Sequence, residues 1–208
     1  GLVASWFGGT KERNPDMCIY VSRLDKGQWT SPINVANGIV NDTLRLATWN
    51  PVLYQVPKGP LMLFYKVGPN VAGWKGYYLT SNDNGKTWSG PTALPDGFIG
   101  PVKNKPVLVG KNTLMCPSST EGDGWKVHFE VTSDWGKTWT KVGPINEGLK
   151  TKVIQPSLLT YKDGRMQVVC RSRNRAVMSS WSSDGGKTWS EMAATHLPNN
   201  NSGTDAVT

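Results

Sequence analysis

The sequences SNDNGKTW at residues 81–88, TSDWGKTW at residues 132–139 and SSDGGKTW at residues 182–189 are three copies of one motif, Ser/Thr-x-Asp-x-Gly-x-Thr-Trp. Their closing tryptophans, Trp88, Trp139 and Trp189, are 51 and 50 residues apart. A weaker copy, SRLDKGQW, occupies residues 22–29. A repeat of this length indicates one structural unit that the chain uses several times.

The residue types of the motif predict a tight turn. An Asp side chain in this position can accept hydrogen bonds from backbone N–H groups two residues further on, and the following Gly can adopt a positive φ. Each box is therefore expected to be a hairpin turn, whose Trp points inward and fills the space between neighbouring hairpins. We expect the boxes to be scaffold that does not touch a ligand.

The residues between the boxes also repeat in a fixed order. A polar residue and Pro open a short apolar strand, as in NPVLY from residue 50, KPVLV from residue 105 and QPSLL from residue 155. A turn and a second apolar strand follow, a third strand leads into the box, and a fourth begins after its Trp. Four antiparallel strands in about fifty residues are typical of a β-propeller blade. No stretch has a helical period, so the sequence predicts an all-β fold.

The number of repeats predicts an incomplete propeller. Propellers close with roughly four to eight blades, and this chain has three whole repeats and part of an earlier one. We expect a single propeller domain over residues 1–208, truncated at both ends. Its blades are predicted at about residues 1–35, 50–95, 104–146 and 155–196, with the start of a further blade at 202–208.

Composition adds constraints on partners and metals. The chain has 23 Lys and Arg residues against 15 Asp and Glu, a net charge of +8 that favours an anionic partner. Cys116 and Cys170 fall at corresponding places on second strands, and with only three cysteines we expect unpaired, buried thiols. His128 and His196 lack the spacing of metal ligands, so we expect no metal and no cofactor.

The boxes and the stretch VVCRSRNRAVMSSWSSDGGKTWS, residues 168–190, resemble the bacterial sialidases and their Asp-box (BNR) repeat relatives. The resemblance covers essentially the whole chain. It implies a sialidase-like β-propeller, six-bladed when complete, with sugar chemistry where first strands begin and second strands end. That place is the end of each blade away from the boxes.

The resemblance also assigns roles to particular residues. Arg171 matches an arginine that clamps the substrate carboxylate in sialidases, and Gln155 stands where sialidases have the Glu that activates their Tyr nucleophile. Because a Gln cannot act as a base, this position departs from the sialidase mechanism. The Tyr and the two other carboxylate-binding arginines of the family would lie outside residues 1–208.

The predicted site consists of loop acids and polar strand ends. The candidate catalytic acids are Glu12 and Asp42, with Asp16 as a rival. The candidate substrate-binding residues are Asn50, Lys66, Lys103, Lys105, Glu121, Gln155, Arg171 and Arg173. Further polar strand-end positions are Asn104, the SSTE segment at 118–121 and the NSGTD segment at 201–205. Trp49, Trp74 and Trp125 are suited either to stacking on a sugar or to packing.

Three functions fit these residues. The first is an exo-glycosidase that releases a terminal acidic sugar, with Arg171 on the carboxylate and Glu12 or Asp42 as general acid. The second is a polysaccharide lyase in which Arg171 and Lys105 neutralise a uronate and His128 or a Tyr removes a proton. The third is a propeller that binds carbohydrate without catalysis. In each case the expected partner is an anionic glycan or oligosaccharide, with no nucleic acid or membrane, in the periplasm or outside the cell.

Overall fold

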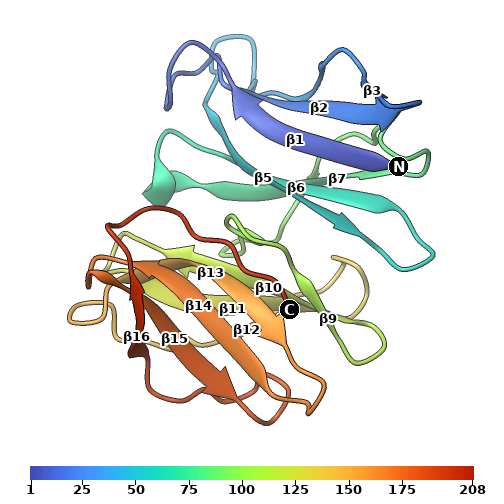
Figure 1. The fold of residues 1–208 in the computed structure, drawn as a ribbon. Helices are drawn as coiled ribbons and strands as arrows, with labels where there is room; N and C mark the ends of the chain where they lie inside the picture. The colour runs from blue at the N-terminus through green and yellow to red at the C-terminus, as the bar shows by residue number, and fades with distance from the viewer. The chain divides into compact units, whose positions relative to one another are not determined.

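The protein is described by a computed structural model of residues 1–208, which form two compact units, residues 1–100 and residues 101–208. Each unit contains two four-stranded antiparallel sheets (Figure 1). The all-β prediction is confirmed: the one helical segment is the short 3-10 helix η1 (Val71–Gly73). No helix of the chain is able to cross a membrane.

The first unit holds the strands of the two N-terminal repeats. Its first sheet is formed by β1 (Leu2–Gly8), β2 (Cys18–Asp25), β3 (Gln28–Trp29) and β4 (Ile33–Ala36). Its second sheet is formed by β5 (Thr48–Gln55), β6 (Leu61–Val67), β7 (Lys75–Ser81) and β8 (Thr92–Ala93).

The second unit repeats the same order of strands. One sheet is formed by β9 (Val107–Val109), β10 (Thr113–Thr120), β11 (Lys126–Thr132) and β12 (Thr140–Val142). The other is formed by β13 (Val153–Thr160), β14 (Met166–Ser172), β15 (Ala176–Ser182) and β16 (Ala193–Pro198). Figure 1 shows these two sheets, green to yellow and orange to red, packed against each other.

The strand order agrees with the sequence pattern, although some strand bounds differ. The first strand of the third repeat starts at Val107, two residues later than KPVLV suggests, and Pro106 just before it has no N–H to give to a ladder. Residues 202–208, predicted to begin a further blade, contain no strand.

The boxes are the turns that their residue types predict. In the second box Asp134 Oδ1 accepts hydrogen bonds from the N–H groups of Lys137 (3.0 Å) and Thr138 (2.8 Å), while the Thr138 hydroxyl donates to Asp134 Oδ2 (2.6 Å). The bound N–H groups thus lie three and four residues on rather than two, which corrects the predicted turn. Gly136 has a positive φ of 99°, as expected. The same Asp–Thr bonds recur in the other two boxes.

The box tryptophans join neighbouring sheets within each unit. Trp189 stacks on Phe129 of β11, with ring centroids 4.7 Å apart and planes inclined by 23°. Trp88 packs on the core that Ile19 and Val21 of β2 share with Leu63 of β6. The prediction that these side chains fill the space between hairpins is therefore confirmed for Trp88 and Trp189.

The cysteines are buried and unpaired, as predicted. Cys116 lies in β10 and Cys170 in β14, the second strands of the two sheets of the second unit. Cys170 belongs to the apolar core of this unit with Phe129 and Val168, and burial raises the pKa of its thiol. Such a thiol serves packing, because the reactive thiolate form is suppressed.

Strand direction separates the boxes from the other end of each sheet. The third box follows the end of β15, whereas Arg171 lies near the end of β14, which is antiparallel to β15. Arg171 pairs with Ile154 near the start of β13. The end of the sheet that carries Arg171 is therefore opposite the end that carries the box.

We predict that Asp134→Ala destabilises the fold without changing the opposite end of the sheet. Hydrogen bonds from Thr138 lower the pKa of Asp134 to about 2, below the value of about 3.9 in unfolded chains. The stabilisation is therefore present above about pH 4 and is lost as pH falls through the folded pKa. Urea unfolding at neutral pH should show a lower midpoint for Asp134→Ala than for Lys137→Ala, an exposed change in the same turn. Equal midpoints for the two variants would contradict this role.

Candidate functional site

The site of the second unit is built around a β-bulge at Gln155. The pairing of β13 with β14 shifts between Ile154 and Ser157, and Gln155 has a φ of 53°. A left-handed backbone is unfavourable for a residue with a Cβ, and the next residue, Pro156, restricts Gln155 further towards extended conformations. Gln155 is therefore a strained position that its neighbours must hold in place.

Two side chains from the preceding repeat hold the backbone of Gln155. The Asn104 amide donates to the Gln155 carbonyl (2.9 Å), and the Gln155 N–H donates to Ser119 Oγ (3.1 Å). Asn104 is 3% exposed and Ser119 is 2% exposed. Because Asn104 and Ser119 are buried and precede or belong to the other sheet of the unit, these bonds hold the Gln155 backbone against that sheet.

Arg171 is held on three sides. Its Nε donates to Asn201 Oδ1 (3.0 Å), and one terminal nitrogen donates to Gln155 Oε1 (3.2 Å). Its guanidinium carbon lies 5.7 Å from the ring centre of Trp125, and that of Arg173 lies 4.1 Å from the same ring. Trp125 is buried. The indole therefore supports two guanidinium groups at once, and Arg171 is ordered before any ligand arrives.

Two lysines lie beside this cluster. Lys103 Nζ donates to Asn104 Oδ1 (3.0 Å) and to the Thr204 carbonyl (3.0 Å). Lys105 Nζ forms an ion pair with Asp205 Oδ2 at 2.6 Å, and both side chains are about half exposed. Arg171, Lys103 and Lys105 bring three positive charges against the single carboxylate of Asp205.

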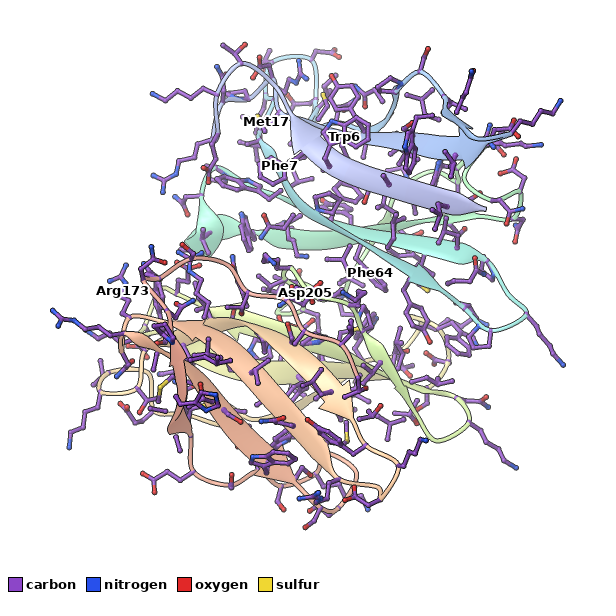
Figure 2. All side chains as sticks on the ribbon, in the orientation of Figure 1. Trp6, Phe7, Met17, Phe64, Arg173 and Asp205 are labelled. Carbon is purple, nitrogen blue, oxygen red and sulfur yellow. The ribbon has the colours of Figure 1, made fainter.

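The segment after β16 connects these groups. In Figure 2 Asp205 lies on this segment, and Arg173 lies in the loop after β14. The segment returns along the Arg171 end of the unit, since Asn201 reaches Arg171 and Asp205 reaches Lys105. Asp205 also contacts the buried Ser157 hydroxyl (3.4 Å). With Lys105, Asn104 and residues 206–208 it lines a pocket of about 200 Å³.

The charges alter the pKa values of the site. Burial lowers the pKa of Lys103, and the charges of Lys105 and Arg171 lower it further, against the opposing effect of Asp205. Partial burial acts to raise the pKa of Asp205, but the hydrogen bond and charge of Lys105 outweigh it, so the pKa is lowered. Asp205 is therefore ionised at neutral pH, and the positive charge of Lys103 is less stable than that of an isolated lysine in water.

The second sheet of the first unit contains the same arrangement in simpler form. Asn50 precedes Pro51, has a φ of 39° and lies at a register shift between Trp49 and Val52. Lys66, fully buried near the end of β6, approaches the Asn50 carbonyl with its Nζ at 3.5 Å. Asn50 and Lys66 thus correspond to Gln155 and Arg171, as the repeat alignment predicts.

The predicted catalytic acids lie in separate loops of the first unit. Glu12 is exposed between β1 and β2, and Asp42 is exposed between β4 and β5. Asp16 is more tightly held: its Oδ2 accepts from the Thr10 N–H (2.9 Å) and from the Thr10 hydroxyl, and these bonds lower its pKa. Its Oδ1 is buried without a hydrogen-bond partner. The catalytic roles of Glu12 and Asp42 stay predictions.

The remaining candidates are placed by packing. Glu121 is half-buried in the turn between β10 and β11. Trp49 is buried, donates its Nε1–H to the Gly68 carbonyl and contacts Trp74, with ring centroids 5.5 Å apart. His128 is buried in β11 with its Nε2 3.0 Å from Glu130 Oε1. Trp49 and Trp125 therefore present little ring surface to a sugar.

The sequence identified most of this cluster but not its internal bonds. Lys103, Lys105, Gln155 and Arg171 were predicted as binding residues, and the structure brings them together with Asn104, Asn201 and Asp205. The role of Asn104 as a clamp, and that of Trp125 as a support for two arginines, were missed. Neither has a local signal in the sequence, since each contact joins residues from different strands or loops.

The site is suited to binding an anion. Its side chains offer the guanidinium of Arg171, the ammonium of Lys103 and the amide of Gln155, whose Oε1 is already bonded to Arg171. Guanidinium and ammonium groups in such a cluster match carboxylates. No group of three His, Cys, Asp or Glu side chains is arranged to hold a metal ion.

Repeated boxes and four-stranded sheets also define a family. The family model described as "BNR repeat-like domain" matches residues 1–208. The chain belongs to this family. No curated protein matches the chain.

Solved structures show the same fold at low sequence identity. The NanB sialidase of Streptococcus pneumoniae (K499G mutant) superposes with a TM-score of 0.79 and 12% identity, over 99% of this chain and 52% of that one. A protein of unknown function from Dyadobacter fermentans gives 0.74 and 18%, over 94% and 66%. The intramolecular trans-sialidase of Ruminococcus gnavus, in complex with oseltamivir carboxylate, gives 0.71 and 12%, over 93% and 68%.

These matches define the fold class. The protein has the sialidase-like β-propeller fold, and its four sheets correspond to part of a sialidase propeller. The chain spans about half to two thirds of the length of these relatives.

We predict that Asn104→Ala loosens the Gln155 bulge. The substitution removes a buried amide that donates to the Gln155 carbonyl and accepts from Lys103. The expected loss in unfolding free energy is about 1–3 kcal/mol, measured by urea denaturation. Asn82→Ala, an exposed change in a box, should stay near the wild-type value. An Asn104→Ala protein as stable as Asn82→Ala would show that the clamp carries no stability.

We predict that anion binding by the site weakens at alkaline pH because of Lys103. Its lowered pKa means that its positive charge is lost at a pH below the ordinary lysine value of 10.5. Arginine at this position would keep its charge throughout. Calorimetric affinity for N-acetylneuraminic acid or galacturonic acid should therefore fall earlier with rising pH in the wild type than in Lys103→Arg. Parallel pH profiles for the two proteins would exclude this role for Lys103.

Proposed function

We propose that the protein acts on an acidic glycan, whose carboxylate binds to Arg171, and that it is an exo-glycosidase of the sialidase type. The observation that carries the proposal is the ordered guanidinium of Arg171. It is half-buried, held by Asn201 and Gln155, supported by Trp125 and flanked by Lys103. Such a preorganised cation gives a planar carboxylate two parallel hydrogen bonds at low entropic cost.

The excess of positive charge supports the same ligand class. Arg171, Lys103 and Lys105 are compensated by Asp205 alone, so about two positive charges remain for a ligand. Burial is the main cause that lowers the pKa of Lys103, and the charges of Lys105 and Arg171 add to it against the opposing effect of Asp205. A bound carboxylate offsets the excess positive charge and favours the protonated form of Lys103. Binding is therefore linked to the protonation of Lys103.

The catalytic part of the proposal assigns the general acid to Glu12 or Asp42, in keeping with the loop acids of sialidases. The solved sialidase of Trypanosoma rangeli binds sialic acid, which is a terminal acidic sugar of the kind proposed here. We further propose a periplasmic or extracellular location, where such glycans are found.

Gln155 favours two alternatives. One is a propeller that binds carbohydrate without hydrolysis, and the other is a uronate lyase. The Oε1 of Gln155 accepts a hydrogen bond from Arg171, and an amide does not take up a proton from a Tyr nucleophile. A lyase needs instead a base near a neutralised uronate. His128, paired with Glu130 in β11, is the histidine that this alternative would employ.

One assay separates these candidates. The protein is incubated with a sialoside and with oligogalacturonate, and the products are analysed by mass spectrometry and ultraviolet absorbance. Release of a free acidic sugar supports the exo-glycosidase, whereas an unsaturated uronate supports the lyase. Binding without a product supports the non-catalytic alternative, and no binding of either glycan overturns the proposed function.

We predict that Arg171→Ala removes most of the affinity for the acidic sugar. The lost ion pair is desolvated by Trp125 and Asn201, so the expected cost is about 2–5 kcal/mol, or at least about thirtyfold in Kd. Arg171→Lys keeps the charge but loses the planar fork, and should bind with intermediate affinity. Lys187→Ala, at the box end of the same sheet, is the matched control and should bind as the wild type. An unchanged Kd for Arg171→Ala would refute the carboxylate assignment.

A further inference from the structure

A second basic pocket adjoins the Arg171 site. It has a volume of about 520 Å³ and is open to solvent. Its lining residues are Ser172, Arg173, Arg175, Pro198, Asn199, Asn200 and Asn201. None of them is an acid. A pocket whose charged side chains are two arginines and whose other polar groups are mostly amides is suited to an anion.

The walls of this pocket are built by buried hydrogen bonds. Asn199 is 9% exposed, and its Oδ1 accepts from the N–H groups of Ser172 (3.3 Å) and Asn201 (3.0 Å). Its own N–H donates to the Arg175 carbonyl (3.0 Å). The loop after β14 and the segment after β16 are thus fixed to each other, and the arginines project from an ordered backbone.

The pocket lies next to the Arg171 site, because Asn201 and Arg173 of its lining contact groups of that site. Asn201 lines the pocket and also accepts the Arg171 Nε–H. Trp125 supports both Arg173 and Arg171, so the two guanidinium carbons are at most about 10 Å apart. Two adjacent sugar rings of an oligosaccharide cover such a distance.

A neighbouring loop adds further positive charge. The Arg173 N–H donates to the Lys152 carbonyl (3.0 Å), and the Asn174 amide donates to the Lys150 carbonyl (2.9 Å). The side chains of both lysines are exposed. Glu147, the acid of this loop, accepts the N–H groups of residues 149–151. The Glu147 carboxylate is therefore occupied by backbone N–H groups of its own loop.

From this arrangement we infer that the Arg173–Arg175 pocket is a second anion subsite, and that the ligand is an oligosaccharide with acid groups on at least two neighbouring sugars. The inference rests on the proposed function and specifies its substrate class. Arg171 receives one carboxylate, and Arg173 and Arg175 receive a carboxylate or sulfate of the next sugar. A glycan with a single terminal acid would leave the second subsite without an anionic partner.

The test compares ligands of one and two or more charges. Calorimetry is performed with N-acetylneuraminic acid and its α2,8-linked dimer, and with galacturonic acid and its trimer. The double variant is R173A with R175N, because Arg175 has a φ of 64° and Asn tolerates this conformation better than Ala. Circular dichroism confirms that it is folded, and the variant R173K with R175K retains the charges.

The double variant should lose at least about tenfold in affinity for the oligosaccharide whose second acid occupies the pocket, while affinity for the matching monosaccharide changes less than about twofold. The lysine variant should recover most of the loss, and high salt should abolish the preference for the longer ligand. An unchanged ratio of the two affinities in the double variant would overturn the second subsite, even where Arg171→Ala still abolishes binding. Failure of the wild type to bind any of the four sugars would overturn the proposed function itself.

Discussion

The left-handed backbone of Gln155 is the constraint on which the site depends. A residue with a side chain that precedes Pro does not adopt a φ of 53° without help. The help comes from Asn104 and Ser119, which belong to the neighbouring repeat and bond both backbone groups of Gln155. The bulge therefore exists only where two sheets meet, and it turns the Gln155 side chain towards Arg171. Packing between repeats thus produces the geometry of the site, as is common where strain is retained at functional positions.

The two ends of each sheet have different physical tasks. At the box end, the Asp carboxylate, the Thr hydroxyl and backbone N–H groups bond within a single turn, so these hydrogen bonds are local. At the other end the bonds join residues far apart in the sequence, such as Lys103 with Thr204 and Arg171 with Asn201. The positive charges of that end exceed the negative ones. Local hydrogen bonds thus stabilise the box end, whereas the end that carries Arg171 depends on bonds between distant residues.

The repeat made the fold predictable, whereas the site was predictable only in part. Box residues specify their turn through contacts within seven residues, which a sequence displays directly, and the alternation around them specifies strands. Lys103, Lys105 and Arg171 were found because the repeat alignment places them at strand ends. The clamp by Asn104 and the support of two arginines by Trp125 were not found, because both depend on contacts across repeats. The late start of the third repeat at Val107 is a small departure of one repeat from the others that the alignment did not reveal.

The protonation states of the carboxylates divide the proposed function into two parts. A glycosidase requires a carboxyl group that holds a proton near neutral pH. Asp205 and Asp16 are the acids with the best-defined surroundings, and the pKa of each is lowered by its hydrogen bonds and charged neighbours. Neither is therefore suited to be the general acid, which leaves that role to a more exposed acid such as Glu12 or Asp42. Recognition of a carboxylate by Arg171 and Lys103, as proposed, needs no such proton, because both side chains are cations that donate hydrogen bonds. The proposed binding of an acidic glycan thus rests on geometry that is already assembled, while the proposed hydrolysis requires a further group whose environment raises its pKa.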